Sequence, residues 1–353
     1  MYPPRPRYDH ILGLIDDTGI FEHARYGVPR REHGYTVDDA TRALIVLCMA
    51  GESPAIHHAQ RILLAFLLSA ITPEGRFRNR LHFDRRWEDD GECGDAQGRG
   101  VWALAVTAIH AADPALRSAA RSALEEVPTL DSPHLRPLAY GALGAHALFM
   151  ADSGDSLARR LAEPALTRLE GTTGIWPEPR LTYGNGRIPA AMLATGVVFE
   201  DDDLLDSGLA SLGWLADVET NGSHFSFTPT YGWAPGEPRP GFDQQPLEAA
   251  AMSDACERAW ELTGDERWRS LVVACGDWLM GDNDRGLALY EPSTGATHDG
   301  LMSDGVNANT GAESTISGLA VLQACSRVGT QLISSSRSGT GTVNTRTPSS
   351  ANP

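Results

Sequence analysis

The sequence predicts an all-α fold in which helical hairpins follow one another and close into a ring. Three observations predict it: apolar residues recur at helical spacing along most of the chain, strand-like alternation is scarce, and short connections alternate with long ones. Helices joined by only a few residues must lie antiparallel as neighbours. About twelve such helices make about six hairpins, which is the arrangement of an (α/α)6 barrel. An open solenoid is the structural alternative.

A short amphipathic segment near residues 7–16 comes first, and it would supply the helix that closes the ring. Helical periodicity then predicts longer helices at 38–50, 54–71, 98–111, 114–126, 134–150, 154–169, 187–199, 203–217, 245–262, 265–280 and 311–327. Tight connections join these helices in pairs, at 51–54, 112–114, 152–155, 200–203 and 263–265. The best strand-like stretch, HFSFT at 224–228, is short.

The long connections hold nearly all of the irregular sequence, and each of them leads into a helix. They cover residues 17–37, 72–97, 171–186, 218–244 and 281–310. On a ring of hairpins these segments meet at one mouth, which is where we expect the functional site. We expect one domain over residues 1–328, followed by a disordered Ser/Thr/Gly/Pro-rich tail over 329–353.

Composition narrows the class of protein. The chain has 353 residues, of which 42% are hydrophobic, and its net charge is −17. The negative charge argues against nucleic acid or an anionic membrane as a partner, because both need a basic surface. No apolar run approaches the length of a membrane span, the N-terminus lacks the apolar core of a signal peptide, and the cysteines are scattered. We therefore expect a cytoplasmic protein.

Aromatic residues in the long connections predict a sugar-binding mouth. Aromatic rings suit the C–H faces of a sugar, while carboxylates, amides and arginines bind its hydroxyls. The substrate-binding candidates of the aromatic kind are Tyr35, Trp87, Trp176 and Tyr183. The polar substrate-binding candidates are Arg42, Asp95, Arg99, Asn185, Gln244, Gln245, Glu248, Asn307 and Asn309.

Three acids are catalytic candidates on the grounds of their position: Asp38, Asp39 and Glu178. A first-turn aspartate suits a general base, because the helix dipole lowers its pKa. We expect one aspartate of the pair to cap its helix and the other, Asp39, to face the mouth. Glu178 follows Trp176 and Pro177, and apolar surface there would raise its pKa, as a proton donor requires. Capping alone is the alternative interpretation for Asp38, Asp39 and Glu313.

No metal or cofactor is expected. The DDLLD stretch at 202–206 matches an acidic metal-binding pattern, but it begins the second helix of a tight hairpin, away from the mouth. The histidines show no HxxxH or HxH spacing.

Five stretches resemble a known group: DDTGIFEHARYGVPRREHGYTVDDATRALI (16–45), GDAQGRGVWALA (94–105), IWPEPRLTYGNGRIPAAM (175–192), DQQPLEAAAMSDA (243–255) and DGLMSDGVNANTGAESTISGLA (299–320). The chain resembles six-hairpin glycosidase-like bacterial proteins, in particular an (α/α)6 domain found fused or adjacent to GT-B glycosyltransferases. The resemblance implies a carbohydrate-active toroid with its site at the inner-helix mouth. It also implies a catalytic pair made of Asp38 or Asp39 and Glu313, which would act across the sugar, with Glu178 as the rival acid. Gly94 and Pro179 depart from the group's pattern, which has acids at both positions.

Three functions are consistent with these residues. The first is an inverting glycoside hydrolase that acts on an oligosaccharide or glycan through two carboxylates. The second is a non-catalytic sugar-binding or scaffold domain whose partner is a glycosyltransferase. The third is a sugar epimerase or isomerase, for which histidines in the long connections would act as acid and base: His33, His82, His224 and His298.

Overall fold

The computed structural model describes residues 3–91, 94–170, 172 and 174–338. This part of the chain forms twelve α-helices. They are α1 (Asp9–Gly13), α2 (Val37–Cys48), α3 (Pro54–Ala70), α4 (Asp95–His110), α5 (Pro114–Glu126), α6 (Leu135–Ala151), α7 (Ser156–Glu170), α8 (Arg187–Phe199), α9 (Asp202–Val218), α10 (Pro246–Thr263), α11 (Glu266–Leu279) and α12 (Ala312–Ser338).

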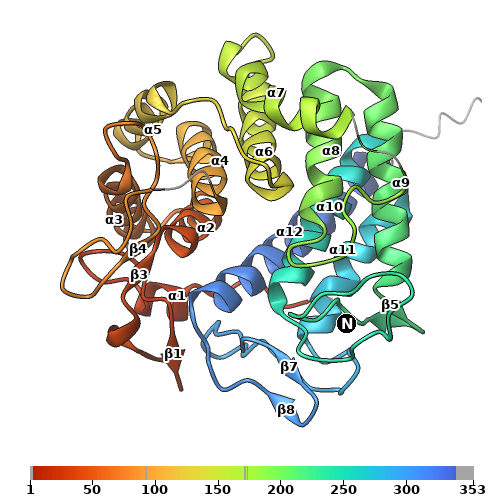
Figure 1. Cartoon of the computed structure of the whole chain (residues 1–353). Coiled ribbons are helices and arrows are strands. Elements are labelled where there is room, and N and C mark those ends of the chain that lie inside the picture. Colours follow the sequence, from red (N-terminus) through yellow and green to blue (C-terminus); the bar gives the residue numbers. More distant parts are fainter. Residues whose placement is uncertain (1–2, 92–93, 171, 173, 339–353) are drawn as a thin grey trace, which may run out of the picture.

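The even-numbered helices form a closed inner ring. Each of them packs against the next, from α2 through α4, α6, α8 and α10 to α12, and α12 packs back against α2 (Figure 1). The odd-numbered helices lie outside, where α3, α5, α7, α9 and α11 each pack on the inner helix that precedes them, and α1 packs on α12. The predicted (α/α)6 barrel and its closure by the N-terminal segment are confirmed, and the open solenoid is excluded.

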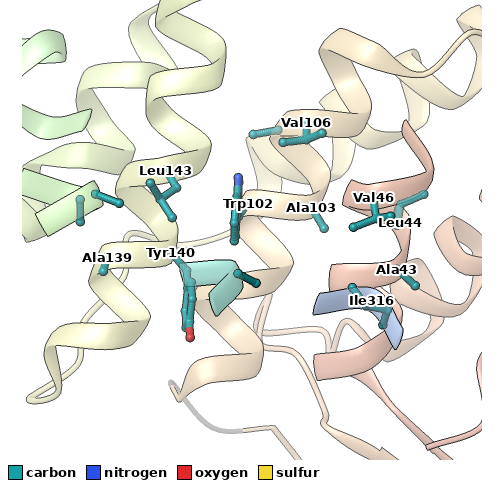
Figure 2. Packing of buried hydrophobic residues seen from close by; sticks show 14 of the residues in the cluster. Ala43, Leu44, Val46, Trp102, Ala103, Val106, Ala139, Tyr140, Leu143 and Ile316 are labelled. Carbon is teal, nitrogen blue, oxygen red and sulfur yellow. The ribbon is translucent and has the colours of Figure 1, made fainter. Parts of the chain in front are cut away.

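Inner and outer helices differ because an inner helix is enclosed on nearly every side. Most residues of α6 and α8 are buried, whereas the outer helix α5 buries only Leu116, Ala120 and Leu124. Large side chains such as Trp102, Tyr140 and Leu143 fill the space between neighbouring inner helices (Figure 2). Alanine and glycine at other positions let the backbones approach closely.

Gly98→Ala tests this close approach. A Cβ atom at Gly98 of α4 would lie 2.8 Å from Pro137 Cα of α6, so the two helices would have to separate. We expect the free energy of unfolding, measured by urea denaturation, to fall by about 2 kcal/mol. Gly213→Ala in the outer helix α9 is the matched control, because its Cβ would meet nothing nearer than 3.9 Å. A stability loss no larger than in this control would contradict close packing at Gly98.

The strands are short and lie in the long connections. Each spans two residues, and they pair as four antiparallel ladders: β1 (Ala24–Arg25) with β2 (Val28–Pro29), β3 (Tyr35–Thr36) with β4 (Arg80–Leu81), β5 (Thr220–Asn221) with β6 (His224–Phe225), and β7 (Leu301–Met302) with β8 (Gly305–Val306). Only the first two residues of the stretch 224–228 are in a strand. The ladders hold the loops in place around the N-terminal ends of the inner helices, where the mouth lies.

The last helix is longer than the expected helix 311–327, and the domain boundary at residue 328 stays a prediction. Helix α12 continues past residue 328 to Ser338, and residues 339–353 of the predicted tail lie outside the described residues. None of the helices in the described ranges combines the length and apolar character that a membrane span requires.

Candidate active site

Charged side chains converge where the inner helices begin. Arginines stand in the first two turns of four inner helices, namely Arg42 on α2, Arg99 on α4, Arg136 on α6 and Arg187 on α8. Acids stand in the first turns of α2, α4, α10 and α12: Asp38, Asp39, Asp95, Glu248 and Glu313. Because all six inner helices begin at the same end of the ring, most of these charges meet at the mouth, whereas Arg187 pairs with Asp254 in the middle of α10.

Asp39 lies in the first turn of α2, where Thr36 is the N-cap. The Thr36 hydroxyl accepts a hydrogen bond from the backbone N–H of Asp39 (3.1 Å) and donates to Asp39 Oδ2 (2.7 Å), and Arg42 Nη2 donates to Oδ1 (2.7 Å). The residue is 3% exposed, and burial raises its pKa to about 6 although Arg42 opposes the shift. The expectation that Asp39 faces the mouth is therefore wrong, because the Thr36 cap turns its side chain inward.

Asp38 is the aspartate of the pair that lines a cavity. The cavity has a volume of about 430 Å³, and its walls are Asp38, Phe77, Asn79, Arg80, Glu88, Asp89, Gly94, Asp95 and Ala96. Asn79 Nδ2 donates to Asp38 Oδ2 (3.2 Å), and Arg99 Nη1 lies 2.9 Å from Oδ1. Four of the lining residues are acids, so the cavity suits a ligand rich in hydroxyl groups.

Arg99 connects this cavity to the third long connection. Its Nη2 atom donates to Asp95 Oδ2 (3.2 Å) and to the Tyr140 hydroxyl (3.0 Å). Tyr183 also donates to Asp95 Oδ2 (2.9 Å), and burial together with Asp95 raises the pKa of the Tyr183 phenol. The predicted binding residues Asp95, Arg99 and Tyr183 are thus brought together beside Asp38.

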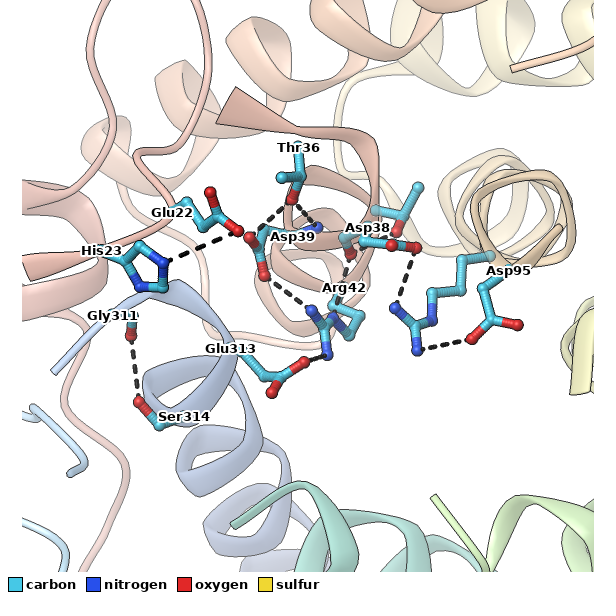
Figure 3. Close-up of polar contacts among 12 residues, drawn as sticks. Glu22, His23, Thr36, Asp38, Asp39, Arg42, Asp95, Gly311, Glu313 and Ser314 are labelled. Carbon is cyan, nitrogen blue, oxygen red and sulfur yellow. Dashed lines mark hydrogen bonds and ion pairs between the residues drawn. The ribbon is translucent and has the colours of Figure 1, made fainter. Parts of the chain in front are cut away.

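Glu313 belongs to the same charged cluster (Figure 3). Arg42 Nη1 donates to Glu313 Oε2 (2.7 Å), so Arg42 bridges the first and the last inner helix through Asp39 and Glu313. Burial would raise the pKa of Glu313, but the Arg42 guanidinium outweighs it and holds that pKa below its usual range. Asp39 and Glu313 therefore share one guanidinium while their pKa values move in opposite directions.

Glu178 has surroundings other than those expected. Both of its carboxylate oxygens accept hydrogen bonds from Arg136 Nη1 (2.7 Å each), so a guanidinium rather than apolar surface faces it. Trp176 packs against Trp214 of α9, with ring centroids 5.5 Å apart, and so faces an outer helix. The apolar environment expected for a proton donor at Glu178 is contradicted.

Glu248 and Asn185 shape a turn. Glu248 accepts hydrogen bonds from the backbone N–H groups of Gly184 (2.5 Å) and Asn185 (3.0 Å) and from Asn185 Nδ2 (3.1 Å). Both side chains are buried, so they position the loop that carries Tyr183 instead of contacting the cavity. Burial and the nearby Glu219 carboxyl raise the pKa of Glu248.

Glu219 offers a test of buried charge. Burial raises its pKa above the ordinary value of 4.5, so the folded protein binds a proton that the unfolded chain has lost. Its contribution to stability therefore falls as the pH rises above 4.5. We expect Glu219→Gln to raise the free energy of unfolding by about 2 kcal/mol at pH 8 and to change it little at pH 5. The exposed Glu163→Gln is the control, and equal effects of Glu219→Gln at both pH values would contradict the prediction.

Several predicted binding residues have structural roles or lie elsewhere. Tyr35 is 1% exposed in the core, where its hydroxyl donates to Asp16 Oδ2 (2.7 Å). Trp87 lines a separate groove beside α3. Gln244 is buried, accepts from the Phe227 N–H (3.0 Å) and donates to Asp284 (2.6 Å), whereas Gln245 precedes α10 without a side-chain capping bond. Tyr35 and Gln244 are thus buried in structural positions and Trp87 lies apart from the cavity at Asp38, so their contact with a sugar stays a prediction.

The two predicted asparagines tie loops together. Asn309 Oδ1 accepts from the Ala24 N–H (3.1 Å), and its Nδ2 donates to Asp299 and to His23 Nδ1. Asn307 Oδ1 accepts from the Asn309 N–H (2.9 Å). These bonds join the first and the last long connections at the seam of the ring.

Glu22, His23 and His33 form a cluster with donor atoms within 4.8 Å of one another. Two contacts argue against a metal there. Asn309 donates to His23 Nδ1, so the neutral ring carries its proton on Nε2, the atom that faces the cluster. Both Glu22 oxygens are held by Arg80, at 2.7 and 2.9 Å. The cluster fits a hydrogen-bonded group of side chains better than a set of metal ligands.

A cavity of about 410 Å³ lies at the opposite end of the ring, between the C-terminal halves of the inner helices. Most of its charges are paired with one another, since Asp254 binds Arg187 and Arg258, and Arg327 binds both oxygens of Glu257. This pairing favours a structural role for the ionic side of the cavity.

Sequence patterns missed four residues that organise the mouth: Asn79, Asp89, Arg136 and Tyr140. Arg136 follows the short connection 127–133, which is not one of the long connections where a site was expected. One signal was available, because Arg136 is a lone charge in the otherwise apolar stretch LRPLAYGALGAHALFMA.

Neither a protein-family model nor a curated protein matches the chain. A sugar epimerase from a ruminal bacterium has a similar structure, with a TM-score of 0.70, 12% identity and coverage of 90% of this chain and 95% of that chain. An inactive variant of an α-1,6-mannanase from Salegentibacter sp. HEL1_6, bound to α-1,6-mannotetrose, is also similar. Its TM-score is 0.61 and its identity 12%, and the match covers 91% of this chain and 96% of that chain. The cellulase Cel9M of C. cellulolyticum, bound to cellobiose, has a TM-score of 0.60 and 11% identity, and the match covers 88% of each chain. At this identity the similarity shows the fold, which is the (α/α)6 toroid.

Proposed function

We propose that the protein is a carbohydrate-active enzyme, and more narrowly an inverting glycoside hydrolase whose site is the cavity at Asp38. The observation that carries the proposal is this cavity of about 430 Å³, which is open at the mouth and lined by Asp38, Glu88, Asp89 and Asp95. Carboxylates that face each other across a space of this kind can act as acid and base on one glycosidic bond.

Asp38 is the proposed general base. Two contacts hold its carboxylate at the cavity wall: Arg99 Nη1 lies 2.9 Å from Oδ1, and Asn79 Nδ2 donates to Oδ2 (3.2 Å). Asp89 accepts three backbone N–H bonds, from Asn79, Arg80 and Gly91, and so fits a structural role in the wall. The proposed partner carboxyl is Glu88 or Asp95.

The comparisons support hydrolysis in one respect. The inactive variant of the similar mannanase has two consecutive aspartates replaced by alanine. This chain has the consecutive aspartates Asp38 and Asp39 at the start of its first inner helix. The proposed division of roles is that Asp38 acts on the substrate while Asp39 orders the helix start.

A sugar epimerase is the second candidate, and a specific observation favours it. The rings of His23 and His33 lie edge to face, with centroids 4.5 Å apart. The His23 backbone lies beside Gly311, just before α12, and its Nδ1 atom accepts a hydrogen bond from Asn309 Nδ2 (2.9 Å). The expected histidine His33 is thus joined by His23, which sequence patterns missed.

One experiment separates these functions. The purified protein is incubated in D₂O with α-1,6-mannotetraose and cellotetraose, and the products are analysed by mass spectrometry. Hydrolysis gives shorter saccharides, and this is the expected result. Epimerisation leaves the chain length unchanged and adds one carbon-bound deuterium. Binding of a probe without either product would instead favour the non-catalytic domain that partners a glycosyltransferase.

A further inference from the structure

A second cavity lies beside the mouth, and it shares no lining residue with the cavity at Asp38. It has a volume of about 330 Å³, at the lower end of the range of roughly 300–1,000 Å³ that small-molecule pockets occupy. Its walls are His10, Tyr26, Gly27, Glu291, Thr294, Ala296, His298, Ala308 and Thr310. These residues come from α1, the β1–β2 hairpin and the last long connection.

Backbone contacts fix the three walls relative to one another. The His10 N–H donates to Thr294 O (3.1 Å), and His10 Nε2 donates to Thr310 O (2.8 Å). The Thr310 N–H donates to Ala24 O (3.0 Å), which attaches the hairpin to the same segment. The cavity is therefore a built feature in which distant parts of the chain meet.

Tyr26 is the unusual residue of this cavity. With Gly27 it forms the two-residue loop of the β1–β2 hairpin, and both residues have positive φ, +51° for Tyr26 and +75° for Gly27. Such a loop favours asparagine, aspartate or glycine at these positions. Tyr26 is also 78% exposed, so burial in the core does not explain an aromatic residue held in a left-handed conformation.

The polar groups of the walls suit neutral hydroxyls. His10 Nε2 donates its hydrogen to Thr310 O, so the Nδ1 atom of the ring can act as an acceptor. Glu291 is paired with His298 Nε2 (3.3 Å) and accepts from the Thr294 hydroxyl (3.1 Å). The Thr310 hydroxyl is buried and has no hydrogen-bond partner among the described residues. Since no arginine is among the lining residues, the cavity is not arranged for a phosphate group.

We propose that this cavity is a second carbohydrate subsite, in which one pyranose unit of the substrate stacks on Tyr26 and its hydroxyls bind Glu291 and His10. The inference rests on the proposed function only in that the ligand is a saccharide. The strained loop is retained because asparagine or glycine would relieve the backbone but remove the stacking surface.

Tyr26→Asn separates binding from stability. Binding of α-1,6-mannotetraose and cellotetraose to the full chain is measured by titration calorimetry, with Asp38→Asn as the background that prevents turnover. Methyl α-D-mannopyranoside and methyl β-D-glucopyranoside are tested by ligand-detected NMR. We expect Tyr26→Asn to weaken the binding of at least one tetrasaccharide about tenfold while Tm stays equal or rises. Glu291→Gln is expected to weaken the same ligand, whereas Tyr231→Asn, which removes an equally exposed tyrosine outside this cavity, leaves the affinity unchanged.

The outcomes distinguish this inference from the proposed function. If neither tetrasaccharide is cleaved but Tyr26→Asn loses binding, the hydrolase proposal is refuted and the subsite proposal is supported. If cleavage occurs and Tyr26→Asn leaves both KM and Kd unchanged, the subsite proposal is refuted and the hydrolase proposal is supported. Absence of binding of all four saccharides to the parent protein at millimolar concentration would also overturn the subsite.

Discussion

Asp38→Asn is expected to reduce turnover of the cleaved oligosaccharide about 10³-fold, because removal of a positioned general base costs about 10²–10⁴-fold. The side chain keeps its size, and the asparagine Oδ1 can still accept from Arg99, so the fold should persist. Asp39→Asn provides the matched control one residue away. Since Asp39 is turned towards Thr36 and Arg42 and does not line the cavity, its variant should lose less than tenfold in kcat.

The measurement is kcat and KM for both variants at a pH where the parent protein is active, with circular dichroism to check folding. A loss confined to kcat in Asp38→Asn indicates a group that acts in the transition state. A larger loss in Asp39→Asn would mean that the assignment of the two aspartates is reversed, and equal losses would contradict the division of roles between them.

Arg99→Met is expected to cause the largest loss of stability, about 3 kcal/mol. Arg99 is 4% exposed and holds Asp38, Asp95 and the Tyr140 hydroxyl. Methionine fills much of the same space but leaves two carboxylates near each other without a cation. Because both acids are partly exposed to solvent, the lower end of the range for broken buried ion pairs applies.

Urea denaturation at pH 7 measures this loss. Arg267→Met is the control, because its partner Asp217 is exposed and such pairs contribute about 0.5 kcal/mol. Adding Asp38→Asn and Asp95→Asn to Arg99→Met should recover part of the stability by removing the unpaired charges. A loss in Arg99→Met that matches the control would show that Arg99 does not hold the helix starts together.

The helices were predictable from the sequence because periodicity and capping agreed. The expected helix 54–71 is α3, Pro54–Ala70, with Ser53 as its N-cap and Pro54 in its first turn. The expected helix 203–217 is α9, Asp202–Val218, capped by Asp201. Local signals suffice here, since each hairpin is fixed by residues close together in the chain.

The site was less predictable because it depends on the direction of single side chains. Asp38 and Asp39 differ by one helical position, which rotates the side chain by about 100°. Thr36 decides which of them turns inward, and that capping bond is visible only in the structure. Tyr35 shows the same limit, since an aromatic residue in a loop can belong to the core or to the mouth.

The closure of the ring also determines at which point of synthesis the chain can complete its fold. Arg42 and Glu313, which are 271 positions apart, form an ion pair across the contact of α12 with α2. In a solenoid each repeat is stabilised by its neighbours and can form as synthesis proceeds. Here the first inner helix obtains its second neighbour only when the last one has left the ribosome. A nascent chain that ends before α12 exposes the apolar flank of α2 throughout translation, so premature termination yields an aggregation-prone fragment and not a smaller folded domain.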